Sequence, residues 1–119
     1  MKAQLFDSEL KVMEILWHSG DTTAKELAKI LGEQIGWSKT TTYTVIKKCV
    51  DKGVIERRGT DFLCHAKISK NQVREQEAQK FVDKMFDGST DLLVASLISS
   101  NKMSPEQLQN LRKMLEDLE

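Results

Sequence analysis

The chain lacks any apolar run approaching the roughly eighteen residues that a membrane span needs. Its first ten residues, MKAQLFDSEL, also lack an apolar core followed by a cleavage site of the secretory kind. Both absences predict a cytoplasmic protein without membrane insertion. The sequence has only two cysteines, Cys49 and Cys64, in segments that we expect to be buried. We interpret them as free structural thiols in a reducing compartment.

The sequence also lacks the groups of polar residues that catalysis and cofactor binding require. It has no glycine-rich phosphate loop, no HExxH motif and no GxSxG motif. His18 lies in a polar turn, and His65 follows Cys64 in a β-prone run, where adjacent side chains point to opposite faces. We therefore predict no enzymatic activity, no metal site and no cofactor.

The formal net charge at pH 7 is zero, since 18 basic residues balance 18 acidic ones, and the pI is about 6.7. Taken alone, this balance argues against a nucleic-acid partner. The charges are unevenly distributed, however. Residues 39–58 hold six basic and two acidic residues, whereas residues 87–119 hold three basic and six acidic ones. One part of the chain can therefore meet a polyanion, and the other cannot.

Three amphipathic segments open the chain, which at 119 residues is long enough for one domain with an appendage. The first helix is expected to start at Ser8 as its N-cap and to end at the turn HSGD. The second starts with a capping box formed by Thr23 and Glu26 and stops near Gly32. The third is predicted over residues 38–53, with serine at its start and glycine at its end.

Two short β-prone runs, Val54–Arg58 and Phe62–Ile68, follow the third helix and are joined by the turn GTD. They are typical of a β-hairpin. Three helices and a hairpin, with a tight connection between the second and third helices, predict a winged helix-turn-helix domain over residues 1–69. The predicted fold class is mainly α with a small β-hairpin.

Residues 70–119 are predicted to form a C-terminal helical dimerisation region. Ser69 and Gln72 open a long helix, Gly88 breaks it, and the residues SPEQ at 104–107 open the last helix. These helices are too thin to bury their apolar faces alone, so we expect a second copy of the chain to cover them. The predicted dimerisation residues are Phe81, Val82, Met85, Leu93, Leu97, Leu108, Leu111, Leu115 and Leu118.

The segment WSKTTTYTVIKKCVDKG, residues 37–53, is unusually rich in hydroxyl side chains for a helix. We interpret Trp37 as a packing anchor at the helix entry rather than as a base-stacking residue, and the core stripe as Val45, Ile46, Cys49 and Val50. The opposite face carries Thr40, Thr41, Thr44 and Lys48, with Lys47 beside it and Tyr43 at its other edge. Such residues lower helix propensity but supply compact donors, acceptors and methyl groups for phosphates and base edges. This face therefore predicts a DNA contact.

Several motifs resemble the penicillinase-repressor family of winged-helix regulators: EILW, WSKTTTYT, KK followed by DKGVIERR, FVDKMFDGS and SPEQL. The resemblance covers essentially the whole chain. It implies a homodimer that binds an inverted-repeat operator in double-stranded DNA and represses transcription. It maps the DNA contacts of the recognition helix to Ser38, Thr40, Thr41, Tyr43, Thr44 and Lys48, and those of the wing to Arg57 and Arg58.

Within this family, the chain resembles the β-lactam-responsive branch more than the copper-responsive branch. Copper-responsive members end in paired cysteines that bind metal, and no cysteine follows Cys64 here. In the β-lactam-responsive branch, a membrane sensor triggers proteolysis of the repressor in its dimerisation region. The resemblance maps the equivalent bond to Ser96 and Leu97, in the apolar segment LLVASLISS. The alternative interpretation is that this segment is dimer core only.

The alternative function is a winged-helix protein-interaction module that does not bind DNA. Such a module should expose apolar residues on the third helix. A DNA-binding domain should instead present Thr40, Thr44, Lys48 and Arg57 on one continuous basic surface.

Overall fold

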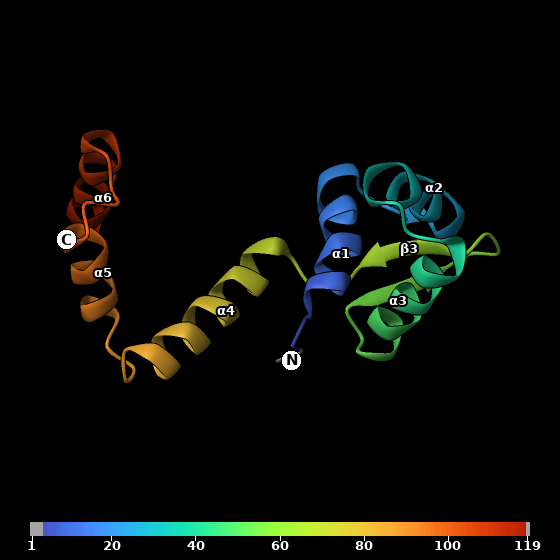
Figure 1. The fold of residues 1–119 in the computed structure, drawn as a ribbon, viewed down its shortest axis with the longest axis horizontal. Helices are drawn as coiled ribbons and strands as arrows, with labels where there is room; N and C mark the ends of the chain where they lie inside the picture. Colours follow the sequence, from blue (N-terminus) through green and yellow to red (C-terminus); the bar gives the residue numbers. More distant parts are fainter. Residues whose placement is uncertain (1–3, 119) are drawn as a thin grey trace. The chain divides into compact units, whose positions relative to one another are not determined.

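The computed structural model describes residues 4–118 of the chain. These residues are mainly helical with a small antiparallel sheet, which confirms the predicted fold class (Figure 1). In chain order the elements are α1 (Asp7–Ser19), β1 (Thr22–Thr23), α2 (Ala24–Ile35), α3 (Lys39–Asp51), β2 (Ile55–Arg58), β3 (Leu63–Ala66), α4 (Lys70–Met85), α5 (Thr90–Ser99) and α6 (Pro105–Asp117).

The predicted hairpin is present, but it belongs to a three-stranded sheet in the order β1-β3-β2. Its strands β2 and β3 are shorter than the β-prone runs, and they pair from Ile55 with Ala66 to Arg58 with Leu63. The additional strand β1 pairs antiparallel with β3, Thr22 lying opposite Cys64. A two-residue strand has no periodicity of its own, so only this pairing defines it.

The first compact unit ends at Gln76 and is built around one apolar core. Helices α1, α2 and α3 pack on one another, and α1 and α3 also contact the sheet. Cys49 and Cys64 are fully buried in this core, as predicted. Burial raises the pKa of the Cys49 thiol to about 12 and that of Cys64 to about 11, so both thiols stay protonated. Trp37 packs against the same core, in agreement with its prediction as an anchor.

Two predicted helix boundaries are wrong, the start of α1 and the end of α2. Helix α1 starts at Asp7 with Phe6 as its N-cap, because the Glu9 carboxylate inside the helix accepts the Phe6 N–H at 2.8 Å. Ser8 is therefore not the cap. Helix α2 continues past Gly32 to Ile35, because the left-handed residue that ends it is Gly36, with φ of 73°.

The caps predicted for α3, α4 and α6 are confirmed. Ser38 caps α3 by accepting the Thr41 N–H at 3.1 Å, and Gly53 follows the helix with φ of 78°. Capping boxes open the two predicted C-terminal helices, with reciprocal bonds between Ser69 and Gln72 at α4 and between Ser104 and Gln107 at α6.

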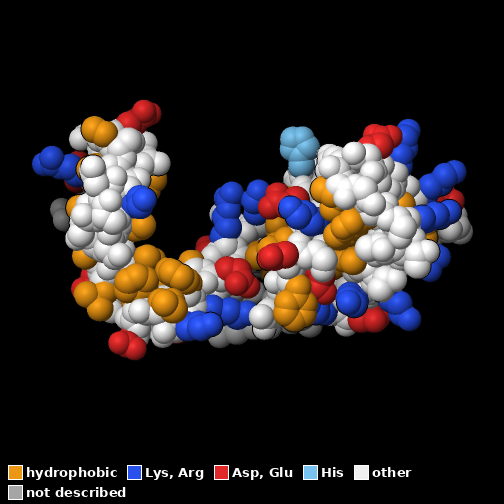
Figure 2. Space-filling view, viewed as in Figure 1, with side chains coloured by type: hydrophobic (Ala, Val, Ile, Leu, Met, Phe, Trp, Pro, Cys, Tyr) orange, Lys and Arg blue, Asp and Glu red, His pale blue; other side chains and the backbone are white. Residues whose placement is uncertain are grey.

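The second compact unit starts at Glu77, within α4, and has little core of its own. Val82 is buried, but no side chain of α5 or α6 is buried in the part of the chain that the structure describes. Figure 2 shows apolar side chains gathered at the surface where α4 ends and α5 begins. None of the described helices combines the length and apolar character that a membrane crossing needs.

An ion pair between a buried carboxylate and a half-buried lysine joins α1 to the end of α3. The Lys52 Nζ lies 2.6 Å from Glu9 Oε1, and the exposed fractions of the two side chains are 28% and 1%. Lys52 also donates to the Gln4 carbonyl at 2.7 Å and lies 4.3 Å from the centre of the Phe6 ring. The pair therefore fastens the N-terminal segment, α1 and α3 together.

We expect Lys52→Ala to lower the free energy of unfolding by about 2–3 kcal/mol, because the Glu9 carboxylate would stay buried without its cation. The matched control is Lys70→Ala, which removes an ion pair with Glu14 whose side chains are 41% and 50% exposed. That variant should cost less than about 1 kcal/mol. Urea titration followed by fluorescence measures both, since Trp17 and Trp37 lie in the first unit. If both variants lost the same free energy of unfolding, the pair between Glu9 and Lys52 would be no more stabilising than an exposed one.

Candidate nucleic-acid interface

Helix α3 presents one buried face and one exposed polar face. Its buried face consists of Thr42, Val45, Ile46 and Cys49, so the core stripe lies where the helical wheel puts it. The exposed side chains are Lys39, Thr40, Thr41, Thr44, Lys47 and Lys48. No acidic residue occurs from position 39 to position 48. The exposed face therefore combines three cations with three short hydroxyl side chains.

The hydroxyl hydrogens of two residues are already used within the helix. Thr44 donates to the Thr40 carbonyl at 2.9 Å, and Ser38 donates to the Thr41 hydroxyl at 2.9 Å. In this arrangement, Thr44 offers oxygen lone pairs and a methyl group to a partner. Lone pairs suit the amino groups of adenine and cytosine, and the methyl group suits the thymine methyl.

Tyr43 lines a shallow depression of about 410 Å³ together with Lys39, Thr40, Thr44 and Lys47. Its ring is half-buried and packs edge to face against Phe62, with ring centres 6.4 Å apart. The Lys39 ammonium lies 5.8 Å from the Tyr43 ring centre. Tyr43 therefore borders the exposed face and also contacts the wing.

The two wing arginines are adjacent in β2, so their side chains leave opposite faces of the sheet. The Arg57 guanidinium lies 4.2 Å from the centre of the Phe62 ring, which also contacts Tyr43 of α3. Within residues 4–118, Arg57 has no ion pair. A phosphate could therefore bind it without displacing a carboxylate.

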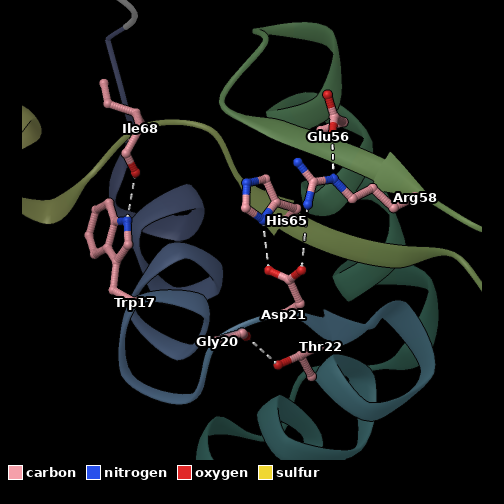
Figure 3. Close-up of polar contacts among 8 residues, drawn as sticks. All are labelled: Trp17, Gly20, Asp21, Thr22, Glu56, Arg58, His65 and Ile68. Carbon is pink, nitrogen blue, oxygen red and sulfur yellow. Dashed lines mark hydrogen bonds and ion pairs between the residues drawn. The ribbon is translucent and has the colours of Figure 1, made fainter.

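Arg58 has a different environment, drawn in Figure 3. It pairs with Glu56 and, at 3.9 Å, with Asp21, which also lies 2.8 Å from the His65 Nδ1. The hydrogen bond from Arg58, together with its charge, lowers the pKa of the Glu56 carboxyl. A phosphate would have to compete with two carboxylates for Arg58.

The structure thus brings most of the predicted DNA contacts together. Thr40, Thr44 and Lys48 follow one another at i, i+4 spacing along α3, and Arg57 is connected to that helix through Phe62. Sequence reasoning omitted Phe62 from the site, because no periodic pattern distinguishes a residue that follows a turn. Lys39 also belongs to the exposed face, and the signal for it in the sequence is its i, i+4 spacing from Tyr43.

The first unit has another surface depression, which is not lined by α3. A depression of about 580 Å³ lies between α1 and α2, with an apolar wall that includes Ile15, Ile30 and Ile35. Among residues 4–118, no group of three or more His, Cys, Asp and Glu side chains is arranged to hold a metal ion.

The predicted dimerisation residues are mostly at the surface of the second unit. Those with exposed side chains are Phe81, Met85, Leu97, Leu108, Leu115 and Leu118; Leu93 and Leu111 are half-buried, and Val82 is buried. The predicted cleavage residues Ser96 and Leu97 are both exposed and lie inside α5, where the Ser96 carbonyl accepts the Ser100 N–H at 3.0 Å.

Comparison with known proteins identifies the family of the chain. The family model described as penicillinase repressor matches residues 5–117. The penicillinase repressor of Bacillus licheniformis is 24% identical over 116 residues, which cover 96% of this chain and 91% of that protein. The methicillin resistance regulatory protein MecI of Mammaliicoccus sciuri is 23% identical, with 94% and 93% covered.

Solved structures of the repressor BlaI are similar to the first unit. Its DNA-binding domain in solution aligns with a TM-score of 0.54 and 26% identity, covering 60% of this chain and 90% of that one. The Bacillus licheniformis BlaI monomeric form in complex with the blaP half-operator aligns over the same shares with a TM-score of 0.52. The winged-helix architecture and the match over residues 5–117 together establish that this chain belongs to the penicillinase repressor family.

Proposed function

We propose that the chain is a sequence-specific DNA-binding repressor that acts in the cytoplasm on a double-stranded operator. The exposed face of α3 carries this proposal, because it combines Lys39, Lys47 and Lys48 with threonines and contains no carboxylate up to position 48. Lysines bind phosphates at many positions, whereas short hydroxyl side chains can reach base edges. The BlaI complex with a half-operator supports the same role for the matching domain.

A protein-interaction module is the competing function, and the surface of α3 argues against it. Such a module needs an apolar contact surface. Among the described residues, the large exposed apolar side chains lie in α4, α5 and α6 or at Phe6 and Ile35, and α3 has none. The surface of α3 is therefore better suited to a polyanion than to an apolar partner.

The proposal is tested by fluorescence anisotropy with a labelled duplex from the promoter upstream of the chain's own reading frame. We expect the chain to bind this duplex more tightly than a scrambled duplex of the same length. We also expect the affinity for both to fall as salt rises, because binding releases counterions from the phosphates. Equal affinity for the two duplexes at all salt concentrations would contradict sequence-specific binding.

Two variants should distinguish a phosphate contact, expected of Lys48, from a base contact, expected of Thr44. Lys48→Ala should weaken binding to both duplexes and reduce the slope of log K against log salt by about one, because one phosphate contact is lost. Thr44→Ala should cost about 1 kcal/mol on the promoter duplex alone, because the base contact is lost. Lys113→Ala is the matched control, since it removes the same charge from α6. If Lys48→Ala lost only sequence preference, the two roles would be reversed.

We further propose that the chain is a homodimer that binds an inverted repeat through two copies of α3. The exposed apolar residues of the second unit support this, with exposed fractions of 57% for Leu115 and 82% for Leu118. A monomer would leave this stripe in water, while an isologous interface would bury it on both copies. Two half-sites would then lie about one helical turn apart, or a small multiple of that.

Leu115→Lys should convert the dimer to a monomer of 13.6 kDa and weaken binding to the two-half-site promoter duplex. The reason is that a lysine ammonium cannot be buried in an apolar interface without a partner. Gln109→Lys places the same charge on the opposite side of α6 and serves as the control. Sedimentation equilibrium gives the mass of each variant. A monomeric wild type would contradict the proposal directly.

Repression is proposed to end by proteolysis between Ser96 and Leu97, triggered by a membrane sensor that responds to a β-lactam or another cell-wall signal. The bond lies within α5, so the helix must unwind before a protease can bind it in extended form. The shallow burial of α5 supports easy local opening. Cleavage there would separate the leucine stripe of α6 from the first unit.

Immunoblotting of the native host after exposure to a β-lactam should show loss of the full-length chain and a fragment that ends near residue 96. A culture treated with an antibiotic that does not act on the cell wall is the control. A full-length band that persisted while the target genes were switched on would exclude cleavage as the trigger.

A further inference from the structure

Phe62 has a backbone conformation that is unusual for its residue type. Its φ is 49°, in the left-handed region that normally selects glycine, asparagine or aspartate. Its carbonyl accepts the N–H of Ala24, the first residue of α2, at 3.0 Å. A strained conformation persists only where the surrounding structure holds it. The contact with α2 is one such restraint, and the position of the ring suggests why a bulky residue is used.

The Phe62 ring lies between the recognition helix and the wing. It packs edge to face against Tyr43 of α3, with planes inclined by 75°. It also contacts the Arg57 guanidinium, at 4.2 Å from ring centre to Cζ. One side chain therefore connects Tyr43, which borders the exposed face of α3, with Arg57, the wing arginine that has no carboxylate partner in the part of the chain that the structure describes.

Stacking on a ring leaves the binding capacity of an arginine intact. The guanidinium N–H groups lie in its plane and point away from the ring face, so they remain available to a phosphate. An exposed arginine without such a support would lose more rotamer freedom when it bound. The neighbouring Arg58 is also held, but by Glu56 and Asp21, which occupy its donors.

We propose that Phe62 is a positioning residue for DNA binding, which holds Arg57 of the wing in a fixed relation to α3 so that both contact one stretch of DNA backbone. This inference rests on the proposed function. It assigns the main wing contact to Arg57 and a minor contact to Arg58. It also explains why an aromatic residue occupies a position where the backbone favours glycine.

The experiment measures anisotropy of the labelled promoter duplex and its scrambled counterpart for the full-length chain. Phe62→Leu keeps an apolar side chain but removes the ring, and Phe62→Tyr keeps the ring as the conservative control. We expect Phe62→Leu to weaken binding to both duplexes roughly fivefold and to reduce the salt slope toward that of Arg57→Ala. Phe62→Tyr should bind like the wild type.

A double-mutant cycle separates positioning from a purely structural role. If Phe62 acts through Arg57, then Phe62→Leu should cause no further loss of affinity in an Arg57→Ala background. Fully additive losses, or wild-type binding by Phe62→Leu, would overturn the inference. A wild-type chain that bound neither duplex would instead overturn the proposed function itself.

Arg57→Lys covers the case in which Phe62→Leu fails to fold, which the tryptophan fluorescence would reveal. This variant keeps the charge and leaves the core untouched, but it lacks the planar group that stacks on the ring. A loss of affinity close to that of Arg57→Ala supports the inference. Wild-type affinity and salt slope for Arg57→Lys would overturn it, because charge alone would then suffice.

Discussion

The packing of the first unit depends on the ion pair between Glu9 and Lys52. Glu9 lies in the first turn of α1 and Lys52 at the C-terminal end of α3, so the pair connects the first helix with the recognition helix. The same carboxylate accepts the Phe6 N–H and thereby fixes where α1 begins. A carboxylate at 1% exposure requires its cation nearby, and this requirement restricts how α3 can lie against α1.

Because α3 is held by its buried face and by Lys52, its exposed face is available to bind a partner. Val45, Ile46 and Cys49 fill the core, so the helix does not depend on its outer face for stability. That face can therefore carry threonines, although they favour helix less than glutamate or lysine would. Among residues 4–118, the wing adds Arg57, which has no ion pair, and Arg58, which is paired with carboxylates. The basic character of the surface is thus set as much by pairing as by the number of charges.

The second unit follows a different principle, since its helices are well capped but poorly buried. Ser104, Pro105 and Gln107 specify the start of α6 locally, while Leu115 and Leu118 remain exposed. Local signals can define a helix without supplying a core, and tertiary contacts normally supply most helical stability. A homodimer would supply the missing contacts, and separation of this region would remove them. The proposed homodimer and the proposed proteolysis that ends repression therefore involve the same exposed leucines.

The sequence by itself determined the helices whose caps are local, the core stripe of α3, the hairpin and the family. Ser38, Ser69 and Ser104 act on residues three positions away, and such signals can be read directly from the chain. Only the tertiary structure decided the strand β1, the partner of Glu9 and the different surroundings of Arg57 and Arg58. Strand β1 pairs with β3, Lys52 is 43 residues from Glu9 and Asp21 is 44 from His65, so no local pattern encodes these contacts. Adjacent arginines look equivalent in a sequence, but in a sheet they leave opposite faces and meet different neighbours.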